Sequence, residues 1–367
     1  MDAIELIPQL ISSLYEGNRR AAEVTAITII RSIKKDYPKV ADEISAIISK
    51  NGVSSNTRSA FSNPLPVDRE TRFALVDIKE PSQILPPILS EYTSAQLCDF
   101  IKERKMLKRF IKAGITPPNG MLLYGPPGVG KTYIARWISA QLNLPLITLD
   151  LATSISSYLG RSGQNLRNIF DYAKSRPSVL LLDEIDAIAK KRDDAADLGE
   201  LKRLVNVLLK EIENYPYTGI IIGATNHPEL LDKAIWRRFD RELEIEMPEF
   251  PQRKELLIRH LEDFISFKSD LIDFLAENTD GVNSADVCKL CEHIKRQIII
   301  DPKTPVKVIA LAELFKAITI SDKGKKQSIC VSLKKEFKSL SQRDIAKITH
   351  IPLSTVSRYL STMKSEE

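Results

Sequence analysis

The amino-acid sequence predicts an α/β fold in which a parallel sheet is sandwiched by helices. Short apolar runs of four or five residues alternate with segments whose apolar residues recur at helical spacing. Apolar runs without polar alternation are typical of strands that helices cover on both faces, as in parallel sheets. A glycine-rich turn also joins one of these runs directly to a helical segment. The chain has 367 residues, which is enough for two or three domains.

Residues 1–51 are expected to form a helical N-terminal domain. Pro8 fits the first turn of its first helix, where the missing N–H costs little. Residues 52–89 are expected to be a linker, because turn-forming residues gather at 54–57 and 62–66. The apolar residues at helical spacing are Ile7, Leu10, Ile11 and Leu14, followed by Val24, Ile27, Ile30 and Ile33.

Residues 90–247 carry the alternating pattern and are expected to form the α/β domain. The expected strands are Met121–Tyr124, Leu146–Leu149, Val179–Leu182, Ile220–Ala224 and Leu243–Glu246. The expected helices are Ser94–Ala113, a segment starting at Thr132, Asn165–Lys174 and Leu198–Asn214. Residues 248–320 then read as a smaller helical domain.

Residues 321–367 form a basic tail. The tail has ten Lys/Arg and five Asp/Glu, so it accounts for the net charge of +5 of the whole chain.

No apolar run approaches the roughly 18 residues that a membrane-spanning helix needs. The start lacks the features of a secretory signal, and four cysteines give no disulfide framework, so a reducing cytoplasm is the expected location.

The segment Gly125–Thr132 reads Gly-Pro-Pro-Gly-Val-Gly-Lys-Thr and has the pattern of a phosphate-binding loop. A strand, a glycine turn and a helix N-terminus in this order present backbone N–H groups to a polyphosphate. Lys131 is expected to reach the β and γ phosphates, and Thr132 to bind Mg²⁺. The sequence therefore predicts a nucleoside triphosphate site, with these contacts: Gly125, Pro126, Pro127, Gly128, Val129, Gly130, Lys131, Thr132 and Tyr133.

Polar residues follow two of the other expected strands. Asp183 and Glu184 end an apolar strand, where Asp183 would bind Mg²⁺ and Glu184 would activate water. Alone, this pair could simply cap the next helix. Asn226 follows a further strand, where an amide can contact the γ-phosphate, although a lone Asn is often a turn residue. Arg237 and Arg238 are either a solvated pair or a source of positive charge for a neighbouring subunit's site.

These motifs, in this order, resemble the AAA ATPases over roughly residues 80–315. The resemblance implies ATP hydrolysis, a hexameric ring with a site at each subunit interface, and Arg237 and Arg238 acting in trans. The segment Thr279–Asp286 resembles the family's lid motif, so residues 248–320 would be the lid and Ala285 would lie beside the nucleotide. Ser284 stands where that motif usually has glycine.

The same resemblance implies a site for protein substrates. Tyr158, Leu159 and Gly160 match an aromatic-aliphatic-glycine triplet that lines the central pore of AAA unfoldases. Apolar side chains can grip an extended chain without reading its sequence. The alternative is a core tyrosine in an ordinary connection. The charged segment 190–197 is either a second pore loop or a solvated loop.

The tail offers a different function. Residues 341–360 resemble a helix-turn-helix, with Ile345, Ala346 and Ile348 packing one helix, and Val356, Tyr359 and Leu360 packing the next. Ser354 would cap a recognition helix that exposes Thr355, Ser357 and Arg358 to DNA. Such modules also dock proteins, and His350 occupies the usual glycine position in the turn.

Three hypotheses follow: an ATP-driven protein remodeller, a DNA-associated ATPase and an ATP-regulated scaffold. The runs around 199–206, 224–232 and 236–240 resemble a bacterial AAA subgroup often encoded beside subtilisin-like serine proteases, which implies a protease partner. No protease motif is present in the chain itself.

Cys288, Cys291 and His293 have a spacing that zinc sites use, but two buried thiols on one helix face are the simpler interpretation.

Overall fold

The computed structural model describes residues 6–15, 25–44 with gaps at 27, 31 and 34–36, 75–113, 115, 118–151, 162–175, 177–187, 198–216, 218–265, 270–317, 330–331, 333–335 and 337–361. The chain divides into two compact units, Met1–Pro64 and Leu65–Glu367. In the first unit, α1 (Ile7–Tyr15) lies in the range expected to be helical. Its small core holds Leu6 and Ile29, with Leu10, Ile33 and Ile44 packed against them.

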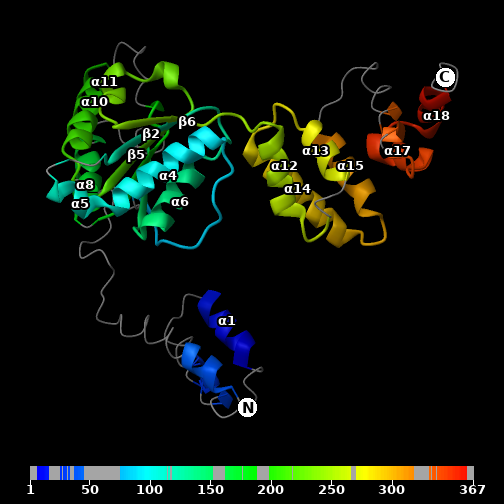
Figure 1. The fold of residues 1–367 in the computed structure, drawn as a ribbon, viewed down its shortest axis with the longest axis horizontal. Helices are drawn as coiled ribbons and strands as arrows, with labels where there is room; N and C mark the ends of the chain where they lie inside the picture. Colours follow the sequence, from blue (N-terminus) through cyan, green and yellow to red (C-terminus); the bar gives the residue numbers. More distant parts are fainter. Residues whose placement is uncertain are drawn as a thin grey trace. The chain divides into compact units, whose positions relative to one another are not determined.

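The second unit contains a six-stranded sheet in the order β1-β3-β4-β5-β2-β6. Strands β5, β2 and β6 of this sheet are labelled in Figure 1. Five strands are parallel, as the sequence predicts, while β1 pairs with β3 in the antiparallel direction. The strands are β1 (Asp77–Lys79), β2 (Gly120–Tyr124), β3 (Leu146–Asp150), β4 (Val179–Asp183), β5 (Ile220–Thr225) and β6 (Arg241–Glu244).

Helices cover this sheet because its central strands are apolar on both faces. Helices α4 (Glu91–Lys105) and α6 (Lys131–Leu142) share one apolar core with β2, β3, β4 and β5. Helices α8 (Ser162–Lys174) and α10 (Leu198–Glu213) pack against each other on the other side of the sheet (Figure 1). Burial of both strand faces makes the sheet a rigid frame for its loops.

The register brings the functional ends of the strands to one edge. Tyr124 at the end of β2 is paired with Thr225 at the end of β5. Asp183 at the end of β4 is paired with Asp150 at the end of β3. In open α/β sheets, this carboxyl edge is where ligands bind.

Several elements differ from the expectation. The sequence did not predict β1, whose three residues lie in the range 52–89 and are too short to show a period. The expected helix 94–113 is divided at Met106 into α4 and α5 (Leu107–Lys112). The Ser90 side chain accepts a hydrogen bond from the Thr93 amide, and this cap sets the start of α4 at Glu91. A short helix, α11 (Lys233–Trp236), precedes β6 and was also not predicted.

The helices after residue 247 share one apolar core. They are α12 (Phe250–Leu261), α13 (Asp270–Glu277), α14 (Ser284–Ile300) and α15 (Val306–Ala317), followed by α17 (Gln342–Thr349) and α18 (Leu353–Ser361). Phe337, just before α17, meets Phe274 of α13 edge to face, with their ring centroids 5.0 Å apart. The tail helices therefore share the core of the helical domain. Among the described residues, no helix is long and apolar enough to cross a bilayer.

Candidate functional site

The loop between β2 and α6 has a backbone that requires glycine. Gly125, Gly128 and Gly130 all have positive φ angles, of 140°, 79° and 103°. A Cβ on Gly125 would lie 2.1 Å from the carbonyl oxygen of Ile245, so any side chain there would displace the backbone. These conformations bend the chain back over the N-terminus of α6, whose first residue is Lys131.

Lys131 lies inside this loop rather than in solvent. Its Nζ donates hydrogen bonds to the carbonyl oxygens of Gly125 (2.7 Å) and Pro126 (2.8 Å). Burial lowers the pKa of Lys131 to about 8, while Asp183 and Asp186 act in the opposite direction. The loop therefore holds an ammonium group whose charge is poorly compensated, and an anion would stabilise it.

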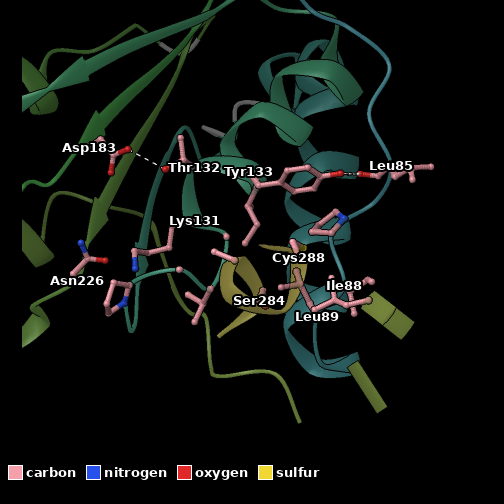
Figure 2. Close-up of a pocket in the computed structure, with 18 of the residues that line it drawn as sticks. Leu85, Ile88, Leu89, Lys131, Thr132, Tyr133, Asp183, Asn226, Ser284 and Cys288 are labelled. Carbon is pink, nitrogen blue, oxygen red and sulfur yellow. Dashed lines mark hydrogen bonds between the residues drawn. The ribbon is translucent and has the colours of Figure 1, made fainter. Parts of the chain in front are cut away.

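Thr132 and Asp183 connect the loop to β4. The Thr132 hydroxyl donates to Asp183 Oδ2 at 3.0 Å, as Figure 2 shows. Glu184, the next residue, has a left-handed backbone with φ of 52°, and its amide donates to Asp183 Oδ1 at 3.1 Å. A hydroxyl beside a carboxylate is a donor set that suits Mg²⁺. A positive φ in a residue with a side chain is uncommon and is found often at active sites.

The end of β5 is fixed to the end of β4 by a buried hydrogen bond. The Thr225 hydroxyl donates to Asp186 Oδ1 at 2.9 Å, and it accepts from the amide of His227 at 3.0 Å. Asn226 lies between these two residues and lines the same cavity as Lys131 (Figure 2). Asp186 and Thr225 thus position Asn226, a role that the sequence interpretation did not assign to them.

The start of α14 is attached directly to the glycine loop. The amide of Ala285 donates to the carbonyl oxygen of Gly128 at 2.9 Å. Asn283 caps α14 by accepting from the amide of Asp286 at 2.8 Å. Its side chain also covers Gly128 so closely that a Cβ there would lie 2.6 Å from it. The helical domain and the loop therefore form one wall.

A cavity of about 900 Å³ lies between the sheet edge and the helical domain. Volumes of this size hold drug-sized ligands and nucleotides. Its polar part is formed by the loop with Asp183, Glu184 and Asn226. The rest is mainly apolar and was not foreseen from the sequence: Leu85, Pro87, Ile88, Leu89, Leu256, Arg259, His260 and Cys288.

The segment before α4 forms one wall of this apolar part. The Tyr133 hydroxyl donates to the carbonyl oxygen of Leu85 at 2.8 Å (Figure 2). Arg259 on α12 donates to the neighbouring carbonyl oxygen of Pro86 at 2.5 Å. Because these bonds come from both the α/β part and the helical part, residues 85–89 are held between them. The sequence alone does not indicate this wall, because its hydrogen bonds join residues that are far apart in the chain.

The cysteine pair is divided between the cavity and the core. Cys288 faces the cavity with its Sγ 3.4 Å from His260 Nε2, and burial raises the pKa of its thiol. Burial lowers the pKa of His260. Cys291 is fully buried in the apolar core, and burial raises its pKa to about 12. The described part of the chain contains no group of three or more side chains arranged as a metal site.

The two predicted arginines do not line this cavity. Arg237 and Arg238 are exposed at the end of α11, where Arg238 pairs with Glu213 at 3.3 Å. This turn is firmly held, because Asp240 accepts hydrogen bonds from the amides of Asn119 and Gly120, both at 2.8 Å. The arginines are thus presented outward from a rigid support.

Two predicted features lie outside the described residues. They are the pore triplet Tyr158, Leu159 and Gly160, and the charged segment 190–197. The assignments of individual residues to the nucleotide, the metal and the substrate stay predictions. The groups at the polar end of the cavity, namely Lys131, Thr132 and Asp183, fit a magnesium nucleoside triphosphate. A glycine loop in which a Cβ on Gly125 or Gly128 would clash, a buried lysine and a hydroxyl–carboxylate pair define the class of P-loop nucleotide-binding proteins.

The family is established by comparison. Residues 121–247 match the model of the "ATPase family associated with various cellular activities (AAA)". The AAA family ATPase y4kL of Sinorhizobium fredii is 37% identical over 224 residues, which are 60% of this chain and 66% of y4kL. The chain belongs to the AAA family of ATPases.

Two further relatives extend the comparison. The proteasome-activating nucleotidase of Methanothermobacter thermautotrophicus is 38% identical over 189 residues, which are 50% of this chain and 46% of the nucleotidase. The crystal structure of the FIGL-1 AAA domain in complex with ADP is 26% identical, with a TM-score of 0.53, covering 72% of this chain and 94% of that domain. This chain thus spans about two thirds of the length of y4kL and about half of the length of the nucleotidase.

Proposed function

We propose that this protein hydrolyses ATP and uses the energy to remodel protein substrates within a hexameric ring. The observation that carries the proposal is the Thr132–Asp183 pair beside the buried Lys131, at the polar end of a nucleotide-sized cavity. The similarity to a structure that binds ADP supports a nucleotide as the ligand.

The chain's own residues supply binding and orientation. Backbone N–H groups of the loop and the Lys131 ammonium hold the phosphates, while Thr132 and Asp183 hold Mg²⁺. Mg²⁺, when bound there, would neutralise the negative charge that develops on the transferred phosphoryl group. The apolar wall at residues 85–89 and Cys288 encloses the nucleoside.

Glu184 and Asn226 act on the attacking water. Glu184 is exposed at the end of β4 and lines the cavity, where its carboxylate accepts a proton from water as the bond to phosphorus forms. Asn226, fixed by the Thr225–Asp186 bond, donates through its amide to the γ-phosphate or to this water. The strained backbone of Glu184 fits a residue held for chemistry rather than for stability.

Arg237 and Arg238 complete the site of a neighbouring subunit. Their exposure, their rigid support and their absence from the cavity of their own chain favour action in trans. A ring of identical subunits is the assembly that places each arginine pair at the next cavity.

Protein remodelling rests on the relatives and on the pore triplet. The curated relatives include a proteasome-activating nucleotidase, a name that links a nucleotidase to activation of the proteasome. In this chain Tyr158 and Leu159 would grip the substrate, with a subtilisin-like protease as the proposed partner. A DNA-associated ATPase is the alternative, and its support comes from the tail.

The Glu184→Gln variant tests hydrolysis. It should bind ATP with wild-type affinity, because the glutamine side chain has the shape of glutamate. Turnover should fall by at least about a hundredfold, because the neutral amide cannot act as a base. Binding is measured by titration calorimetry and turnover by phosphate release. Asp183→Asn should differ by also losing Mg²⁺-dependent affinity. Undiminished turnover in Glu184→Gln would show that another group is the base.

The Tyr158→Ala variant tests remodelling. Basal ATP hydrolysis should stay at the wild-type rate, while ATP-dependent unfolding of a labelled model protein should be lost, since the apolar grip is gone. Tyr92→Ala, which removes an exposed tyrosine from α4, is the matched control. Continued unfolding by Tyr158→Ala would reject the pore mechanism and leave the ATPase assignment intact.

A further inference from the structure

The last helix of the described chain, α18, has one apolar face and one polar face. Val356, Tyr359 and Leu360 are buried in the core of the helical domain. We propose that the opposite face of α18 binds double-stranded DNA in the major groove and reads base edges there. That exposed face carries Ser354, Ser357, Arg358 and Ser361, with Thr355 partly exposed beside them.

The two tail helices have a firmly defined geometry. A capping box starts α17, because Ser341 and Asp344 exchange side-chain-to-backbone hydrogen bonds at 3.1 and 2.9 Å. His350 ends α17 in the left-handed conformation, with φ of 54°, and only residues 350–352 separate the two helices. A three-residue turn between packed helices is the arrangement in which a second helix enters the major groove.

The size and composition of α18 suit this groove. Its nine residues extend about 14 Å at 1.5 Å per residue, and the major groove is about 12 Å wide. Serine, threonine and arginine can all bond to base edges, and arginine can contact guanine through two hydrogen bonds. Arg358 is exposed within this row, between Ser357 and Ser361.

The charges around α18 favour a polyanion. Among the described residues from 330 to 361, the basic ones outnumber the acidic ones, and the one acidic residue, Asp344, is engaged in the capping box. Asp301, on another element, also interacts with the tail: the hydroxyl of Thr304 lowers the pKa of its carboxyl most, and Lys347 lowers it further. The exposed basic residues are Lys335, Lys338, Arg343, Lys347 and Arg358.

A protein partner would fit this face less well. The centres of protein interfaces are usually apolar and aromatic and have few charges. Among the described residues of α18, one large apolar side chain is strongly exposed. It is Leu353, at the first position of the helix. The polar row therefore resembles a surface for base edges, and the lysines on α17 and before it would contact phosphates.

The test uses the full-length protein and a pool of duplex DNA with a randomised core. Repeated selection should enrich a sequence motif, and affinity for that motif should fall steeply with salt. Arg358→Ala should weaken binding to the selected duplex by about tenfold or more and relax the preference at one position. Arg343→Ala and Lys347→Ala should instead weaken all duplexes alike and lower the salt slope by about one each.

The control is Lys102→Ala, which removes an exposed cation from α4 and should leave DNA binding unchanged. ATP hydrolysis should be the same in all these variants, which shows that they fold. No duplex binding at low salt, binding without an enriched motif, or an Arg358→Ala variant that binds like wild type would each overturn the proposal.

Discussion

At the scale of single residues, Lys131 shows how the fold prepares a site for an anion. The loop buries its ammonium group against two carbonyl oxygens, and burial outweighs the attraction of Asp183 and Asp186. The result is a pKa of about 8 rather than the usual 10.5. A lysine with this pKa loses its charge at mildly alkaline pH unless an anion holds the proton in place.

Nucleotide affinity should therefore depend on pH in one direction. The bound phosphates raise the pKa of Lys131, so affinity should be constant below about pH 8 and should fall as pH rises above it. Fluorescence titration with a labelled ATP across this range measures the effect. Lys131→Arg keeps its charge and should bind more weakly but with no such dependence. A wild-type affinity that stays flat to about pH 9.5 would contradict the shifted pKa.

The residues that the sequence predicted are those that belong to a local motif. Gly125, Lys131, Thr132 and Asp183 lie together because one loop and one strand end place them there. Cys288 was assigned only to a spacing pattern, yet it faces the cavity beside His260. Its role depends on a contact between two helices, and no local spacing encodes such a contact.

At the scale of elements, the helix caps do more than begin helices. Asn283 and Ser341 are both N-caps whose side chains accept from a backbone amide three residues later. Asn283 also covers Gly128 of the phosphate loop. Ser341 begins α17, in the tail, where its side chain exchanges hydrogen bonds with Asp344.

Replacing each cap with alanine should separate these two roles. Both Asn283→Ala and Ser341→Ala should cost about 1 kcal/mol of folding free energy, because each leaves an amide of the first turn without its partner. Only Asn283→Ala should also weaken ATP binding. Thermal unfolding and ATP titration of both variants provide the two readouts. Equal ATP affinities in the two variants would mean that Asn283 is only a cap.

The parallel strands were predictable because burial on both faces leaves apolar runs such as Val179–Leu182. β1 was not, since its three residues have an exposed or half-exposed pattern and pair only at the sheet edge. The break at Met106 was also hidden, because α4 and α5 together have continuous helical composition. Such features depend on tertiary contacts that override local preference.

At the scale of the whole molecule, we propose that a single chain holds only part of the catalytic site. The cavity is lined by the loop and both carboxylates but not by Arg237 or Arg238, which follow α11. The sequence resemblance implied that these arginines serve another subunit, and the fold supports this by exposing Arg237 and Arg238 on a rigid turn.

Mixing two inactive variants should restore hydrolysis if this is so. Arg238→Ala subunits keep an intact loop, and Lys131→Ala subunits keep intact arginines. In an equal mixture, up to about one quarter of the interfaces should combine both intact parts and regain activity. Phosphate release from the mixture and from each variant alone measures this. Lys233→Ala, an exposed cation on the same short helix, should be fully active alone. No recovery would rule out action in trans.

The common core of the tail and the helical domain has a mechanical consequence. Phe337, Ile345 and Val356 lie in the same apolar cluster as Leu290 of α14, the helix that forms one wall of the cavity. A force applied to a partner bound at the tail would thus be transmitted to α14 through packed side chains. Such a force would oppose movement of the cavity wall, so the rate of ATP hydrolysis would depend on whether a partner is bound to the tail.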